Sequence, residues 1–124
     1  MPTHSYQHLV EFVQQQGGEY FRTAVSFTAD DWEIIYRRDD LPRERAEERS
    51  ADIVDEARRR TPLRKQESPF GAFHASIELY ENGVFAVLRD GHSSGVVISL
   101  ERAAARDLAS FIHRCERILN RPDQ

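Results

Sequence analysis

The spacing of apolar residues along the chain changes from a helical period to a strand-like period and back. Apolar side chains three and four residues apart predict a helix over residues 5–16, which Gly17 ends. Alternating apolar and polar residues over 21–27 and 32–37, joined by a polar turn, predict a β-hairpin. The first third of the chain is therefore expected to hold one helix and two paired strands.

The middle of the chain has the weakest pattern. Residues 43–49 contain almost no apolar side chain, so this stretch is either a solvated helix or an ordered loop. Ser50 offers a helix start of its own, because a serine side chain can cap the first free amides of a helix. Ile53 belongs to a narrow apolar stripe, and the arginines up to Arg60 suit the C-terminal end of a helix. A polar linker over residues 61–70 follows.

Strand patterns return in the second half of the chain. Asn82 and Gly83 are a strong hairpin signal between the first two of these strands. The last two strands are apolar on both faces, which is typical of strands inside a covered sheet. Ser99 then caps a strongly amphipathic helix. The predicted elements are strands over 71–80, 84–88 and 96–98, a helix that ends near residue 119, and a short tail over 120–124.

The resulting order of elements, α-β-β-α-β-β-β-α, predicts an α+β fold in a single domain over residues 1–124. The hairpins pair the second strand with the first, and the fifth with the fourth and third. Joining the first strand to the fifth gives a five-stranded antiparallel sheet in the order 2-1-5-4-3. We expect the first and last helices to cover one face of this sheet and the middle helix to cover the other.

This element order resembles the roadblock/profilin-like fold, which includes longin-type domains, over the whole chain and without a diagnostic motif. Roadblock-like domains act as dimeric scaffolds and as regulators of small GTPases, so the resemblance implies a role of that kind. The amino-acid sequence itself is also similar to a family of small uncharacterised haloarchaeal proteins. That family carries no assigned activity. The segments that carry the second resemblance are residues 29–41, 52–56 and 95–101.

Charge narrows the classes of partner. The 124 residues carry a net charge of −4, which argues against general affinity for nucleic acids or membranes. Sixteen of the seventeen basic residues are arginine. Five of the seventeen fall between Arg58 and Lys65, which is the sharpest local concentration of charge and a candidate site for phosphate or nucleic acid.

The remaining composition limits location and metal chemistry. The single Cys115 excludes an intramolecular disulfide and any multi-cysteine metal centre, and its place on the apolar stripe of the last helix predicts that it is buried. The sequence shows no signal-peptide pattern and no apolar run long enough to span a membrane. We therefore expect a cytoplasmic protein without a membrane partner.

Candidate catalytic motifs are weak. Residues 91–95 match G-x-S-x-G, but they stand between two strands rather than between a strand and a helix, so we interpret them as a hairpin turn. His4 and His8 share one helical face, and the acidic pairs at 30–31 and 39–40 could hold a cation. Aspartates in turns also satisfy local amides without any metal. We therefore assign no catalytic, cofactor-binding or metal-binding residue, and we expect no enzymatic activity.

The leading hypothesis is a non-enzymatic protein-interaction or regulatory module. Aromatic residues near the sheet edges, together with arginines, are typical of interaction surfaces, and an open edge strand invites pairing with a second copy. We expect a homodimer formed through a sheet edge and the middle helix. The alternatives are a nucleic-acid-associated regulator that uses the basic cluster and a small-ligand sensor with a pocket between sheet and helix. The candidate interaction residues are Trp32, Tyr36, Ile53, Arg58, Arg59, Arg60, Arg64, Lys65 and Tyr80.

Overall fold

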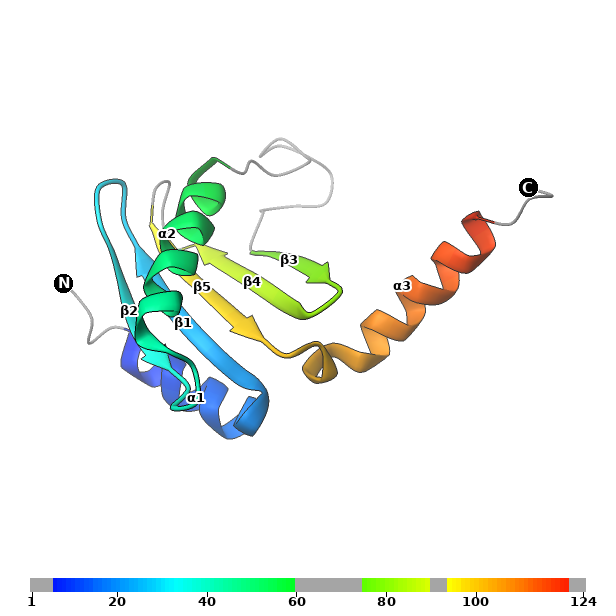
Figure 1. Cartoon of the computed structure of the whole chain (residues 1–124), viewed down its shortest axis with the longest axis horizontal. Helices are drawn as coiled ribbons and strands as arrows, with labels where there is room; N and C mark the ends of the chain where they lie inside the picture. The colour runs from blue at the N-terminus through cyan, green and yellow to red at the C-terminus, as the bar shows by residue number, and fades with distance from the viewer. Residues whose placement is uncertain (1–5, 60–74, 90–93, 121–124) are drawn as a thin grey trace.

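The computed structural model of the chain (Figure 1) describes residues 6–59, 75–89 and 94–120. The expected linker over 61–70 and residues 91–93 of the G-x-S-x-G segment lie outside these ranges. The elements are α1 (Gln7–Gly17), η2 (Gly18–Tyr20), β1 (Phe21–Phe27), β2 (Trp32–Arg37), α2 (Arg43–Arg59), β3 (Ala75–Tyr80), β4 (Gly83–Arg89), β5 (Gly95–Leu100), η3 (Arg102–Ala105) and α3 (Arg106–Leu119).

The five strands form one antiparallel sheet in the order β2-β1-β5-β4-β3. This order confirms the predicted topology, including the pairing of β1 with β5, which no hairpin dictates. The α+β fold class and the order of the elements are likewise as predicted. β5 is the central strand, flanked by β1 and β4, and β2 and β3 are the two edges of the sheet.

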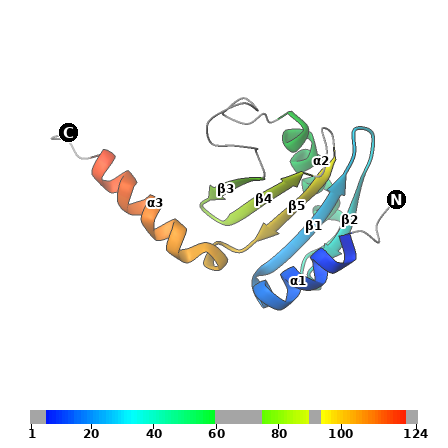
Figure 2. The same ribbon diagram turned by 180° about the vertical axis from the view of Figure 1, so that it is seen from behind.

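One face of the sheet is covered by α1, which lies over β1 and β2 when the molecule is viewed from behind (Figure 2). Leu9 and Val13 of α1 pack against a cluster formed by Phe21, Ala24, Val96 and Ile98. The helix ends where expected, and Gly18 takes a positive φ of 53° that a residue with a side chain rarely adopts. This face is thus covered on its β2-β1-β5 side.

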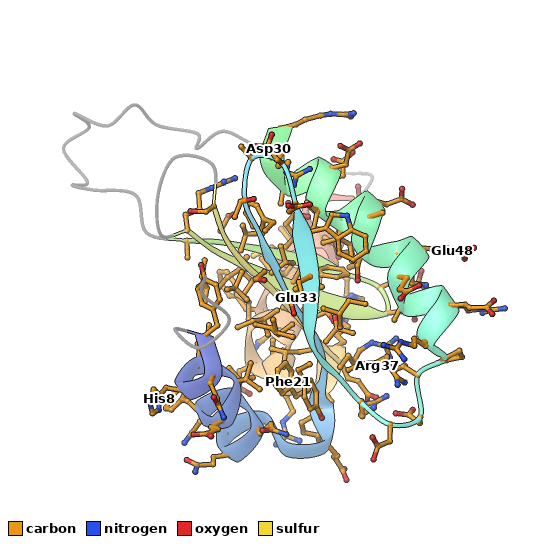
Figure 3. The ribbon with its side chains drawn as sticks, turned by 90° about the vertical axis from the view of Figure 1, so that its left-hand side faces the viewer. His8, Phe21, Asp30, Glu33, Arg37 and Glu48 are labelled. Carbon is orange, nitrogen blue, oxygen red and sulfur yellow. The ribbon has the colours of Figure 1, made fainter. Side chains whose placement is uncertain are left out.

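The other face is covered by α2, a continuous helix of 17 residues, which decides between the two alternatives for residues 43–49. Its buried side chains recur every three or four residues and include the small Ala46 and Ser50, which is why the apolar stripe is hard to see in the sequence. Charged residues fill the outer side of the helix, where Glu48 points away from the sheet (Figure 3).

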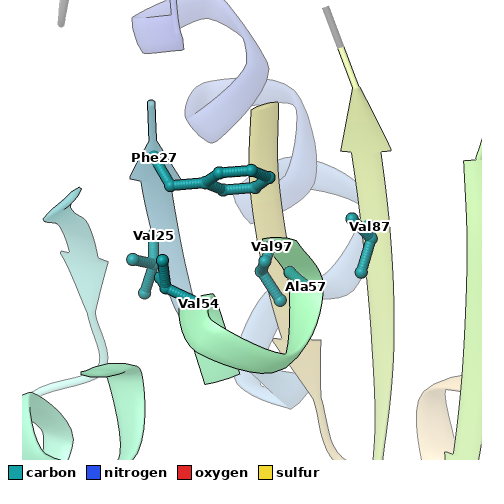
Figure 4. Close-up of a cluster of buried hydrophobic side chains, with 6 residues drawn as sticks. All are labelled: Val25, Phe27, Val54, Ala57, Val87 and Val97. Carbon is teal, nitrogen blue, oxygen red and sulfur yellow. The ribbon is translucent and has the colours of Figure 1, made fainter. Parts of the chain in front are cut away.

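Four of the six buried residues in the core under α2 are valine. Val25 and Phe27 of β1, Val97 of β5 and Val87 of β4 meet Val54 and Ala57 of α2 (Figure 4). β-branched side chains stand well on a pleated sheet, and the two helix residues fill the gaps between them. This cluster fixes how α2 lies across the three inner strands.

The last helix departs from the expected arrangement. We expect α3 to lie beside α1 on the sheet, but it leaves the end of β5 through η3 and projects away from the sheet on the β3 side (Figures 1 and 2). Only Ala109 of α3 is buried. The expectation of a buried cysteine is therefore also wrong for the single chain, since Cys115 is exposed. In the described part of the chain, no helix is long and apolar enough to cross a membrane.

Candidate functional site

Two of the candidate aromatic residues serve mainly to pack the sheet. The ring of Tyr36 stacks on that of Phe21, with ring centroids 4.1 Å apart and an interplanar angle of 16°. Trp32 is half-buried and packs against the cluster under α2. The β2 edge therefore offers little of its aromatic surface to a partner.

Two other candidates, Ile53 and Tyr80, come together at one groove. It has a volume of about 180 Å³ and lies between α2 and the β3–β4 hairpin, with acidic residues on its rim. Tyr80 packs edge-on against Phe85, with ring centroids 5.6 Å apart, and its hydroxyl donates a hydrogen bond of 2.6 Å to Glu78. Tyr80 itself remains exposed at the end of the edge strand.

The basic cluster does not form a free surface in the part of the chain that the structure describes. Arg58 donates hydrogen bonds to the carbonyl oxygens of Thr28 and Asp31, at 2.9 and 2.8 Å, and so holds the β1–β2 turn. Arg59 pairs with Asp55 one turn earlier, at 3.1 Å. The other members of the cluster, Arg60, Arg64 and Lys65, lie outside the described residues. The two described members of the cluster, Arg58 and Arg59, are thus engaged within the chain.

In the acidic pair at 39–40, the carboxylate of Asp40 is engaged by an arginine. Arg38 donates to both carboxylate oxygens of Asp40, at 2.5 and 3.1 Å, and to Glu101 at 2.7 Å. These hydrogen bonds hold the pKa of Asp40 below its usual range and raise that of Arg38. Among the described residues, no group of three or more His, Cys, Asp or Glu could hold a metal ion. His4 lies outside those residues.

Four of the eight large hydrophobic residues exposed in the described part of the chain lie on α3, whose apolar stripe the sequence predicts to be covered. On α3, apolar side chains fill a stripe about 120° wide, as on a helix that packs against a sheet. Phe111 is 61% exposed and Leu119 is 74% exposed. The remaining members of the stripe are Leu108, Ile112, Cys115 and Ile118.

A matching apolar surface lies on the α1 side of β3 and β4, beyond the reach of α1. Ile77 of β3 stands opposite Ala86 of β4, and Leu79 stands opposite Val84. Ile77 is 61% exposed. An open groove of about 590 Å³ separates this surface from α3, and Leu108 and Ile112 of the α3 stripe line the same groove as Ile77 and Leu79.

The sequence contains a signal for each of these two apolar surfaces, the α3 stripe and the outer β3–β4 surface. The strong helical periodicity of α3 marks a stripe that must be covered, but periodicity does not say by what. The alternation of β3 likewise marks an apolar side without saying which helix lies over it. That the α3 stripe and the outer β3–β4 surface do not cover each other becomes clear only once the path of η3 is known.

Comparison with protein families gives one result for this fold and site. A family model described as a domain of unknown function (DUF7522) matches residues 7–120. No curated protein and no solved structure matches the chain. The match spans every described helix and strand, including α3. The chain therefore belongs to the family of domains of unknown function DUF7522.

Proposed function

We propose that this chain is a non-enzymatic interaction module whose copies associate as a homodimer through the β3 edge of the sheet and α3. The observation that supports it best is the pair of exposed apolar surfaces on one chain, the α3 stripe and the part of the outer β3–β4 surface around Ile77. Contiguous apolar patches of this kind mark interaction sites on small domains.

The direction of α3 favours a second copy as the partner. The helix projects past the β3 edge of the sheet, away from β2 (Figure 1). When two copies face each other with their β3 edges, each α3 reaches over the other copy's β3 and β4. The 14 residues of α3 are about 21 Å long. Strands of six and seven residues, as in β3 and β4, extend about 20–24 Å, so the helix and the surface match in length.

The open edge itself supports the same arrangement. β3 has a hydrogen-bonded neighbour on one side only, and an unprotected edge is a template for another strand. In a symmetric dimer the same patch of both copies forms the interface, so each contact is made twice. One arrangement thus covers the edge, the sheet surface and the helix stripe together.

The exposed apolar area comes close to that of a specific interface. A half-exposed Phe, Leu or Ile leaves on the order of 100 Å² of side chain in water. Large apolar residues exposed on the two surfaces therefore leave about 500 Å² per copy, and two copies bury about twice that. This approaches the roughly 1,200–2,000 Å² of specific stable interfaces before smaller residues are counted. The residues counted are Ile77, Leu108, Phe111, Ile118 and Leu119.

The proposal moves the helical part of the interface from the middle helix, which the sequence favours, to the last one. Every buried residue of α2 faces the sheet, and Ile53 packs against the same core. The outer side of α2 is charged, as expected of a solvated surface. The resemblance of the element order to roadblock-like domains, which act as dimeric scaffolds, supports self-association as such.

The test is the mass of the protein in solution, measured by size-exclusion chromatography with light scattering across a range of concentrations. We expect a dimer for the natural chain. Phe111→Arg on α3 and Ile77→Arg on β3 should each give a monomer. Each variant places a charged side chain in the proposed dimer interface, where it would lose its contact with water. Both residues are exposed in the single chain, so neither change should unfold it.

Phe12→Arg is the matched control, since Phe12 is an exposed aromatic residue on α1, away from both surfaces. It should leave the dimer intact. A natural chain that stays monomeric at high concentration would sink the proposal. Loss of the dimer in Phe111→Arg but not in Ile77→Arg would replace it with a contact between two α3 helices.

A further inference from the structure

A separate pocket of about 230 Å³ opens on the α2 side of the sheet, beside the N-terminal half of that helix. Three arginines line it: Arg22 from β1, and Arg45 and Arg49 from successive turns of α2. No aspartate or glutamate is among its lining residues. In a chain with 21 acidic residues and a net charge of −4, this is a local excess of positive charge.

The three guanidinium groups have no anionic partner within the described residues. None of them makes an ion pair within 4 Å or a side-chain hydrogen bond there, whereas Arg38 and Arg59 each pair with a carboxylate. Arg22 contributes only weakly to the lowered pKa of Asp40, whose carboxylate is already held by Arg38. Within the described part of the chain, the three guanidinium groups are therefore left without a carboxylate in contact.

The floor of the pocket is polar at a depth where the rest of the core is apolar. Ser50 and Ser99 are 2% and 6% exposed, and they are the buried polar residues of the described part of the chain. Both line this pocket, together with Thr23. The hydroxyls of Thr23 and Ser99 are hydrogen-bonded to each other at 2.5 Å. The site thus combines buried hydroxyl groups with arginines nearer to the solvent.

The rest of the wall is apolar. Leu41, Pro42, Ala46, Ile53 and Phe85 supply the apolar part of the lining. Guanidinium groups match the planar, two-pronged geometry of a carboxylate or the oxygens of a phosphate. Hydroxyl groups can donate to the same oxygens. A ligand that combines an anionic group with a small apolar body therefore suits every part of this lining.

We infer that this pocket binds a small organic anion, with its carboxylate or phosphate between the arginines and its apolar part against Ile53 and Phe85. The volume lies below the roughly 300–1,000 Å³ of pockets that take drug-sized ligands, so a ligand smaller than a nucleotide fits it. The pocket lies on the opposite face of the sheet from the outer β3–β4 surface, so this inference does not depend on the proposed dimer.

The test is isothermal titration calorimetry of the full chain with benzoate, phenyl phosphate and benzamide. Benzamide has the shape of benzoate without its charge. We expect binding of benzoate or phenyl phosphate and none of benzamide, and the two anions separate a carboxylate preference from a phosphate preference. Arg45→Gln/Arg49→Gln should weaken binding of the preferred anion by at least about tenfold, because it removes two of the three charges.

The control is Arg59→Gln/Arg117→Gln, which removes the same charge at exposed positions outside the pocket lining. It should bind like the natural chain. Equal weakening in the two double variants, binding of benzamide as tight as that of benzoate, or binding of none of the three compounds would each overturn the inference. Circular dichroism of both variants checks that their folds are unchanged, so that a loss of binding reports on the pocket.

Discussion

Gly95 shows at the residue scale how a missing side chain lets two strands pair. A Cβ atom at this position would lie 2.2 Å from the carbonyl oxygen of Leu88 and 3.0 Å from the Cα of Arg89. Both are backbone atoms of the neighbouring strand, so neither can move aside cheaply. The close approach of the β4 backbone thus explains the glycine at the end of the G-x-S-x-G segment without a catalytic nucleophile.

We therefore expect Gly95→Ala to lower the free energy of unfolding by about 1–3 kcal/mol, as overpacking of a closed structure does. Urea denaturation followed by circular dichroism measures it. Gly83→Ala is the control, because a Cβ there lies 3.4 Å from its nearest neighbour and should cost much less. Equal losses in the two variants would contradict the steric explanation.

Asp40 predicts a response to acid. Its pKa is lowered in the folded chain, mainly by the hydrogen bonds from Arg38, so the ionised form stabilises the fold. This contribution is complete above the ordinary aspartate pKa of about 3.9 and disappears as pH falls through the lower folded value. Asp40→Asn should be less stable than the natural chain at pH 7, and the difference should shrink towards pH 3.

The difference in stability between the natural chain and Asp40→Asn is measured from the midpoints of urea denaturation at several pH values between 7 and 3. The natural chain should lose stability below about pH 4 more steeply than the variant. A difference that stays constant over the whole range would show that Asp40 acts through packing or local hydrogen bonding rather than through its charge.

At the scale of elements, the C-terminal end of α2 is tied to the sheet by two arginines. Arg89 of β4 donates a hydrogen bond of 2.6 Å to the carbonyl oxygen of Ala57, which lies in the last turn of the helix. Arg58 reaches across to the β1–β2 turn. A residue that the sequence places in a basic surface cluster thus has a structural task.

Arg58→Ala should lower the free energy of unfolding by about 1 kcal/mol, since it removes two charge-assisted hydrogen bonds at a partly exposed site. Arg59→Ala removes the neighbouring charge and one exposed ion pair, for which we expect a loss of about 0.5 kcal/mol or less. Thermal and urea denaturation of the two variants compare them directly. A larger loss for Arg59→Ala would refute the role of Arg58 at the turn.

Elements are predictable from the sequence where the period of apolar residues is strong. The five strands and their order follow from alternation, hairpin signals and the doubly apolar β4 and β5. α2 is harder, because Ala46 and Ser50 fill its inner side and carry little hydrophobic signal. The arginine pocket is not predictable at all, since it joins residues from β1, β4, β5 and α2 that only the fold brings together.

At the scale of the whole molecule, the path of the short connection η3 decides which apolar residues are exposed on the surface. The sequence identifies the apolar stripe of α3 correctly, but the four residues of η3 carry the helix off the sheet. A stripe that is covered within the chain and a stripe that is left exposed have the same periodicity. Only the three-dimensional direction of α3 separates them.

Cys115 offers a direct measure of whether a second copy covers this stripe. It is the only cysteine of the chain, it lies in the middle of the α3 stripe, and it is exposed in a single copy. In the proposed dimer it would lie against the other copy's sheet. Its rate of reaction with a thiol reagent such as Ellman's reagent should therefore fall as protein concentration rises, because a buried thiol reacts slowly.

Phe111→Arg provides the reference, since it should keep the protein monomeric and the reaction fast at every concentration. The concentration at which the natural chain slows to half the rate of the variant should agree with the dissociation midpoint from light scattering. A rate in the natural chain that is fast and independent of concentration, while light scattering reports a dimer, would place the dimer contact elsewhere than on α3. A rate that is slow even when the chain is monomeric would instead show that α3 folds back onto its own sheet.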